Sequence, residues 1–253
     1  MTAHAFPTPT HSGVTAPTTE TAHPLVHVFD LNDAGDLYRL EKASTTFHSV
    51  RLSSGVYFPA LANSISSSRP EIFILNLRFH APSETFTSDL ALWLREHRRF
   101  CFVILWPSSF SAELPVAKYA MVLRQRPGLA EDLTAFFENF LNPTNLLRCD
   151  QADLNLITQG RGCWQLLSYS DASSHTPEKL SAAGRSLLAT ATPLPATPKW
   201  LMSFKASAEA LKGNPVGVLL RPLTTTQPQA IFTCSVGKTT AAGFQAAVLS
   251  EKG

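Results

Sequence analysis

Hydrophobic and polar positions alternate along the first half of the chain in a pattern that predicts strands and helices in turn. Residues 71–77 and 100–106 form two nearly continuous apolar runs rich in β-prone residues, which is typical of strands buried on both faces. Between them, apolar residues recur at helical spacing over 84–99. Shorter strand patterns occupy 25–29 and 47–52. Because strand, helix, strand units are almost always right-handed with parallel strands, we expect a mostly parallel sheet with helices.

The second half carries a different succession of elements. An apolar stripe over 129–141 predicts a helix that packs into the core. Beyond it we expect a helix over 177–188 and strands at 163–169, 200–204, 216–220 and 231–236. The sequence therefore predicts an α/β fold, in which the mostly parallel N-terminal sheet with its helices is followed by a smaller α+β C-terminal domain.

We expect the chain to divide into five segments. The first, 1–23, is rich in Thr, Pro, Ala and His and has almost nothing to bury, which predicts a disordered tail. The others are a first domain at 24–145, an acidic loop with a connecting helix at 146–162, the C-terminal domain at 163–237 and a C-terminal tail at 238–253. The last segment is assigned as a tail because it is Ala-rich and its hydrophobic pattern is weak.

Composition narrows the classes of function. The chain has 21 Lys and Arg against 19 Asp and Glu, so its overall charge does not favour nucleic acid as a partner. The four cysteines show no metal-ligand spacing, and Cys101 and Cys234 lie in apolar runs where they should be buried, which favours a reducing compartment. A membrane-spanning helix needs about 18 consecutive apolar residues, and every apolar run in the chain is much shorter than that. The first cation is Arg39, so we expect no cationic leader, and the chain is expected to be cytoplasmic. Because no Cys or His stands at metal-ligand spacing from another Cys, we also expect no metal.

Two carboxylates, Asp150 and Asp153, stand in the polar stretch after the 129–141 helix. The simplest interpretation is a loop-to-helix junction, with Asp153 in the first turn of a short helix where a negative charge is favourable. Gly160 or Gly162 would end that helix. A carboxylate pair at this spacing is by itself a weak sign of any chemistry.

The order of elements and this loop together resemble the tubulin/FtsZ family of filament-forming GTPases. In FtsZ the loop after the core helix reads Asn-x-Asp-x-x-Asp-Val, with a glycine nine residues after the last Asp. The present chain has Arg148-Cys-Asp150-Gln-Ala-Asp153-Leu154, and Gly162 stands at that interval. The segments 100–110, 176–188 and 230–237 resemble further pieces of the family in the same order. The resemblance implies that 24–145 is a degenerate form of the family's nucleotide domain.

The family binds GTP through glycine loops whose backbone N–H groups contact the phosphates, and this chain departs from that pattern. After the strand at 71–77 it has Arg78-Phe-His-Ala-Pro-Ser83, which contains no glycine, and Pro82 offers no N–H. The first strand is followed by three carboxylates between Asp30 and Asp36 that would repel a triphosphate. Arg78 supplies a single charge. We therefore expect no family-type GTP binding, no cofactor and no catalytic residue acting within this chain.

In the family the acidic loop enters the nucleotide pocket of the next subunit and orients water for hydrolysis. Asp150 and Asp153 match its two carboxylates, while Arg148 replaces its Asn. The resemblance thus implies a pseudo-GTPase that acts by protein interaction and regulates or caps filament assembly of a bona fide FtsZ, the partner being FtsZ or another filament subunit. A scaffold or adaptor of the same fold for an unrelated protein is the alternative.

A small-molecule α/β enzyme is a third, weaker hypothesis. It would require a catalytic constellation, and the histidines have no Ser or Cys partner at motif spacing. The histidines considered are His27, His48, His80, His97 and His175.

Overall fold

The structure of the 253-residue chain is a computed structural model. It describes residues 25–31, 49–51, 71–78, 84–96, 101–107, 115–142, 144–149, 153, 161–172, 175–191, 193–240 and 243–252. The expected tail at 1–23 lies outside these residues, as does most of the segment between the first two strands.

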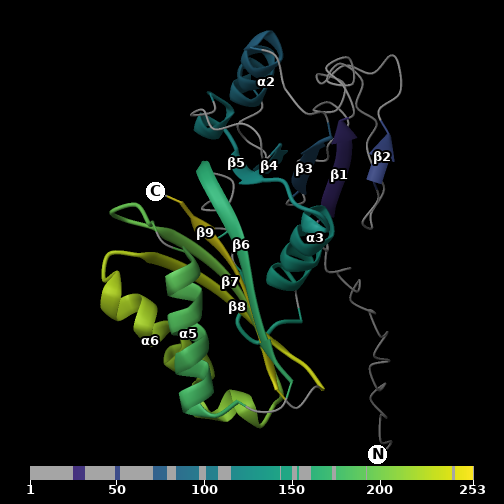
Figure 1. The fold of residues 1–253 in the computed structure, drawn as a ribbon. Helices are drawn as coiled ribbons and strands as arrows, with labels where there is room; N and C mark the ends of the chain where they lie inside the picture. The colour runs from purple at the N-terminus through teal and green to yellow at the C-terminus, as the bar shows by residue number, and fades with distance from the viewer. Residues whose placement is uncertain are drawn as a thin grey trace, which may run out of the picture.

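Within the described residues, nine strands form one continuous sheet (Figure 1). Their order across the sheet is β2-β1-β3-β4-β5-β6-β9-β7-β8. The strands are β1 (Leu25–Leu31), β2 (Ser49–Arg51), β3 (Glu71–Leu77), β4 (Cys101–Trp106), β5 (Met121–Arg124), β6 (Gly162–Asp171), β7 (Lys199–Ala206), β8 (Ile231–Lys238) and β9 (Phe244–Glu251).

The sheet changes character at β6. All pairs from β2 to β6 are parallel, whereas β9 is antiparallel to both of its neighbours, β6 and β7, and β7 and β8 are again parallel. The first three residues of β6 pair with β5, and Trp164 and the residues after it pair with β9. The predicted fold class is therefore confirmed, and β6 joins the two halves.

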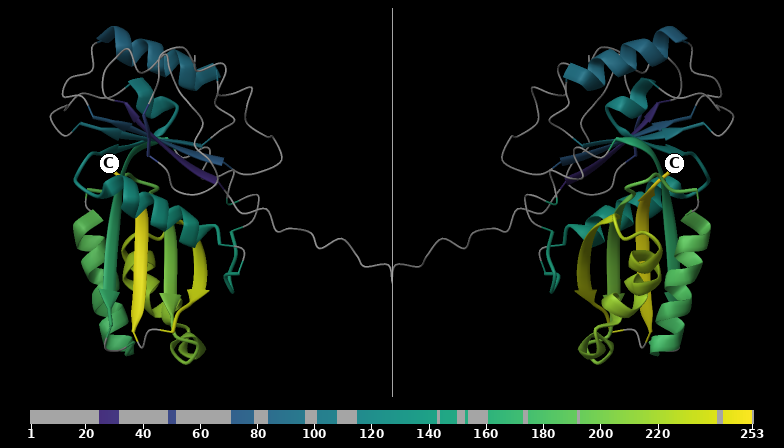
Figure 2. Two further views of the ribbon diagram at one scale, coloured as in Figure 1. Left: turned by 90° about the vertical axis from the view of Figure 1, so that its right-hand side faces the viewer. Right: turned by 90° about the vertical axis from the view of Figure 1, so that its left-hand side faces the viewer.

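Helices pack on both faces of the parallel half, and two helices pack on one face of the C-terminal half (Figure 2). Helix α2 (Glu84–Glu96) and the 3-10 helix η2 (Pro115–Lys118) pack on one face of the parallel half, where Trp93 lies 4.9 Å from Phe102 between ring centroids. Helices α5 (Pro177–Ala191) and α6 (Pro215–Thr226), with the 3-10 helix η3 (Ala210–Gly213), pack on one face of the C-terminal half. These helices enclose two of the three hydrophobic clusters.

Helix α3 (Leu129–Phe140) forms the third cluster and serves both halves of the sheet. Its Phe136, Phe137 and Phe140 are buried together with residues of β1, β3 and β4 and with Leu201 and Leu249 of the C-terminal strands. The apolar stripe predicted for 129–141 is thus the core helix of the protein. Because α3 packs against both halves, the packing of one half depends on the other.

The segment 216–220, expected to be a strand, is instead part of α6. The Asn214 side chain accepts a hydrogen bond from the Gly217 N–H at 3.2 Å, and Pro215 occupies the first turn, where its missing N–H costs nothing. Leu219 and Leu223, one helical turn apart, are fully buried against α5. The run of Val and Leu residues looks β-prone, but its cap and its burial pattern make it a helix.

The expected C-terminal tail at 238–253 is wrong, because Phe244–Glu251 forms β9 between β6 and β7. Phe244, Ala246 and Val248 are buried on one face and Leu249 on the other. Small residues weaken the hydrophobic pattern of this strand, which pairs with a neighbour on both edges. Strand β5 was not expected from the sequence either, since it is only four residues long.

Cys101 is buried in β4, as predicted, with 2% of its surface exposed. Burial raises the pKa of the Cys101 thiol to about 12, so it stays protonated and acts as a small apolar core residue. Burial raises the pKa of Cys234 to about 12 as well, although its side chain on β8 is only partly covered.

Candidate functional site

The carboxyl ends of β1, β3, β4 and β5 point to one edge of the parallel half, beside the N-terminus of α3. In open α/β sheets this edge is where ligands bind. A crevice of 440 Å³ opens there. Its lining residues are Asn76, Arg78, Leu105, Gln125, Arg126, Pro127, Gly128, Leu129, Ala130 and Glu131.

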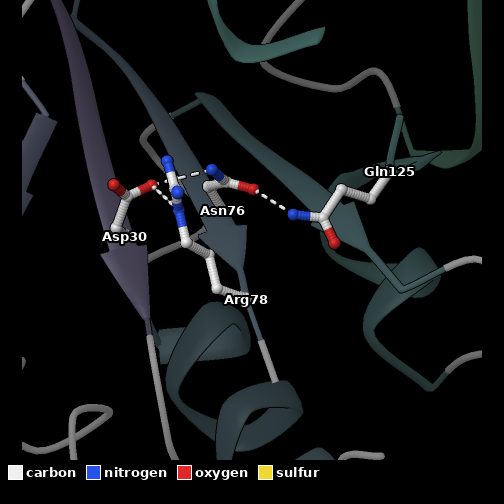
Figure 3. Close-up of polar contacts among 4 residues, drawn as sticks. All are labelled: Asp30, Asn76, Arg78 and Gln125. Carbon is white, nitrogen blue, oxygen red and sulfur yellow. Dashed lines mark hydrogen bonds and ion pairs between the residues drawn. The ribbon is translucent and has the colours of Figure 1, made fainter. Parts of the chain in front are cut away.

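A chain of polar contacts links the strand ends at this edge (Figure 3). Asn76 Nδ2 donates to Asp30 Oδ1 at 2.7 Å, and Gln125 Nε2 donates to Asn76 Oδ1 at 2.8 Å. Arg78 Nε forms an ion pair with the same Asp30 oxygen at 2.9 Å. Asp30 and Asn76 are 8% and 5% exposed. The four side chains, which we call the strand-end network, therefore satisfy one another and tie β1, β3 and the residue after β5 together.

The second arginine of the crevice is also paired. Arg126 Nη2 lies 2.7 Å from Asp132 Oδ2 in the first turn of α3. Gly128 is the N-cap residue that precedes the helix, its φ of 74° is left-handed, and no side-chain hydrogen bond caps the helix at this position. The crevice thus combines a positive helix terminus with two arginines whose charges are each balanced by a carboxylate.

The predicted acidic loop lies at the other end of α3. Arg148 is exposed in the segment that follows the helix, Asp153 is half-buried in helical conformation, and Asp150 lies outside the described residues. The 12 residues of α3 separate this end from the crevice by about 18 Å. The structure therefore does not bring Arg148 together with Arg78 within one chain.

The segment before Arg148 is fixed to the edge of the sheet. Leu146 N–H donates to the Val236 carbonyl at 2.7 Å, and Val236 N–H donates to the Leu147 carbonyl at 3.0 Å. Asn145, 5% exposed, donates from Nδ2 to the Asn139 carbonyl of α3 at 2.7 Å. Held in this way, Leu146 and Leu147 remain 56% and 51% exposed. The loop end of α3 therefore presents two leucines on a structured backbone.

Sequence reasoning missed several of these residues. Asn76 carried a signal, since it is the one polar residue inside the apolar run Ile72 to Leu77. Gln125 carried none, because β5 was not expected. The two exposed leucines have no periodic pattern, and only the structure shows that their backbone is bonded to β8 while their side chains are exposed.

Replacing Asp30 with alanine should lower the free energy of unfolding by about 2 kcal/mol, because it leaves the Asn76 amide and the Arg78 guanidinium without their shared acceptor. Urea denaturation measures this loss. Glu209→Ala is the control, since it breaks an ion pair with Lys212 in which both side chains are exposed, and it should cost under about 0.5 kcal/mol. Equal losses in the two variants would mean that the strand-end network does not stabilise the sheet.

No group of three or more His, Cys, Asp or Glu side chains is arranged to hold a metal ion in the described part of the chain. None of the described helices is long and apolar enough to cross a membrane.

Comparison with solved structures identifies the fold. A mutant of FtsZ from M. jannaschii matches 90% of this chain and 91% of its own, with a TM-score of 0.59 at 11% identity. TubZ from Bacillus thuringiensis serovar israelensis, in GDP-form protofilaments, matches 89% and 84% with a TM-score of 0.54 at 10% identity. CetZ2 from Haloferax volcanii, in a GTPγS-bound protofilament, matches 77% and 68% with a TM-score of 0.50 at 10% identity. The chain thus has the fold of the tubulin/FtsZ family.

No protein-family model and no curated protein sequence matches the chain. At these identities the structural likeness shows the fold alone.

Proposed function

We propose that this chain, built on the fold of FtsZ, TubZ and CetZ, is a pseudo-GTPase that binds a filament subunit and regulates or caps its assembly. The observation that carries the proposal is the strand-end network, in which Asp30, Asn76, Arg78 and Gln125 bond to one another where a nucleotide would need free donors. The protein acts by interaction and does not hydrolyse a nucleotide of its own.

Two features of the crevice argue against phosphate binding. A polyphosphate needs unpaired cations and closely spaced backbone N–H groups. Here Asp30 neutralises Arg78 and Asp132 neutralises Arg126. The six residues from Arg78 to Ser83 contain no glycine. A triphosphate would have to displace two ion pairs and lie against their carboxylates.

The loop end of α3 supports the interaction part of the proposal. TubZ was solved in GDP-form protofilaments and CetZ2 in a GTPγS-bound protofilament. In this chain, Leu146 and Leu147 are more than half exposed at the loop end, next to Arg148. We infer that these two leucines contact the partner subunit. Asp150 and Asp153 follow, and we infer that they face the nucleotide of the partner subunit.

The first test is calorimetry of the purified protein with GTP and Mg²⁺. A Kd weaker than about 1 mM is expected, which corresponds to a binding free energy of only about −4 kcal/mol. Micromolar GTP binding would overturn the pseudo-GTPase assignment.

The second test mixes the protein with FtsZ and GTP. Substoichiometric amounts should reduce the FtsZ that sediments, because a cap blocks the end of a growing filament. The double variant Asp150→Ala/Asp153→Ala should lose this effect at least about tenfold, on the assumption of one charge-assisted contact per carboxylate. The matched control, Glu84→Ala/Glu96→Ala, removes two carboxylates from α2 and should act like the wild type. Unchanged sedimentation and phosphate release with the wild type would contradict the regulatory function.

A further inference from the structure

The chain passes from α3 to the acidic loop through a turn that is bonded to β8. In this turn the Asn145 N–H donates to the Asn142 carbonyl at 3.1 Å. The next two residues, Leu146 and Leu147, bond to the backbone of Val236 in β8. Asn145 is therefore the residue at which the chain leaves the helix end and reaches the sheet.

Asn145 has a buried side chain with a specific partner. It is 5% exposed, although Thr144 and Leu146 on either side of it are exposed. Its Nδ2 donates to the main-chain carbonyl of Asn139, in the last turn of α3, at 2.7 Å. The side-chain oxygen of Asn139 in turn accepts a hydrogen bond from Lys205 Nζ of β7. The last turn of α3 is thus bonded to the sheet by Lys205 and to the start of the acidic loop by Asn145.

Gly237 of β8 leaves the space that the Asn145 amide occupies. A Cβ at Gly237 would lie 2.7 Å from Asn145 Oδ1 and 3.6 Å from Asn145 Cγ. The backbone of Gly237 is not in the left-handed region, so its conformation is open to any residue. The close approach of Asn145 is therefore what a larger residue would disturb here. We call Asn139, Asn145 and Gly237 the loop anchor.

The loop anchor stands close to the two carboxylates in the sequence. Asp150 and Asp153 follow Asn145 by five and eight residues. The strand that holds the anchor, β8, is paired with β7 along its whole length. A loop whose first residues are already held in place loses less conformational freedom when a partner binds than a loop that is free at both ends.

We propose that Asn145 is a positioning residue, which fixes the start of the acidic loop on β8 so that Asp150 and Asp153 meet the partner subunit from a preorganised backbone. The inference rests on the proposed function, in which these carboxylates face the nucleotide of the partner. Because Asn145 is buried, it acts through the loop and not by contact with the partner.

The first experiment measures the mobility of the loop in the full chain without a partner. Backbone ¹⁵N relaxation should give Leu147 and Arg148 order parameters of about 0.85 in the wild type, the value of a rigid backbone. Asn145→Asp keeps the size of the side chain but replaces its N–H donor with an oxygen, and both values should fall below about 0.6. A residue that only adds to overall stability would leave the order parameters of the folded protein unchanged.

Gly237→Ala is the second variant, since it displaces the Asn145 amide while leaving Asn145 in the sequence. It should loosen Leu147 and Arg148 in the same way, which keeps the test decisive if Asn145→Asp does not fold. The matched control is Thr144→Ala. It removes an exposed hydroxyl from the same turn, one that donates to Asn142 Oδ1, and should keep the order parameters of the wild type.

The second experiment repeats the sedimentation assay with FtsZ and GTP. Asn145→Asp and Gly237→Ala keep both loop carboxylates, but their loop has to be ordered on binding. They should need at least about fivefold more protein than the wild type for the same loss of sedimented FtsZ. Thr144→Ala should act like the wild type.

Rigid Leu147 and Arg148 amides in both variants would overturn the proposal. Variants with a loosened loop that reduce FtsZ sedimentation as well as the wild type would also overturn it, because the carboxylates would then act without the anchor. A wild type without effect on FtsZ would instead overturn the proposed function, and the relaxation data would still decide whether Asn145 fixes the loop. The two failures are therefore distinguishable.

Discussion

Replacing Gly184 with alanine is expected to lower the free energy of unfolding by about 3 kcal/mol, at the upper end of the range for overpacked cores. A Cβ at this position would lie 2.1 Å from the Leu219 carbonyl oxygen and 3.2 Å from Pro222 Cγ. The clashing oxygen belongs to the backbone of α6, so no side-chain rotation relieves the contact. Helices α5 and α6 would have to move apart and uncover the hydrophobic cluster that they share with β7.

Urea denaturation followed by circular dichroism measures this effect. The control is Gly213→Ala in η3, where an added Cβ meets nothing within 4 Å, and it should change stability by less than about 0.5 kcal/mol. A Gly184→Ala variant as stable as the Gly213→Ala variant would show that α5 and α6 do not pack this closely.

Truncating Phe137 to alanine is expected to cost about 4 kcal/mol, as for other fully buried phenylalanines. Phe137 is 0% exposed and lies in the cluster that α3 builds with both halves of the sheet. The cavity would open at the junction of the two halves. The loss should therefore appear in both halves at once, in a single unfolding transition.

Tryptophan fluorescence separates the two halves, because Trp106 lies in β4 and Trp200 in β7. Single-tryptophan variants that keep one or the other should unfold at the same urea concentration, and Phe137→Ala should shift both midpoints equally. Glu138→Ala, on the exposed side of the same helix, should leave both midpoints nearly unchanged. Separate midpoints for the two tryptophans would mean that α3 does not couple the halves.

The elements predicted most accurately from the sequence are those that are deeply buried, because burial requires a clear pattern of apolar residues. The runs at 71–77 and 100–106 are continuous because β3 and β4 lie between layers of helices, and both strands appear within one residue of the predicted bounds. The stripe at 129–141 became α3 for the same reason. The elements that were missed have weak patterns, since β5 is short and β9 contains small residues.

The candidate site likewise contains one residue that the sequence made recognisable and contacts that it did not reveal. Arg78 was recognisable as a charge at the end of a strand, but its pairing with Asp30 joins residues 48 positions apart and depends on β1 lying beside β3. The partner of Asn76 on the far side, Gln125, required a strand that the sequence pattern did not reveal. The roles of Arg148, Asp150 and Asp153 remain predictions that the sedimentation experiment tests.

The sequence by itself determined the α/β class, the core helix and the order of elements that resembles the tubulin/FtsZ family, because these depend on local periodicity and on residues close together in the chain. Only the tertiary structure decided that β9 fills the middle of the C-terminal half, that the strand ends bond to one another and that Leu147 pairs with Val236 at the outer edge of β8. These features depend on pairing between distant segments, whose geometry is set by the packing of the whole sheet.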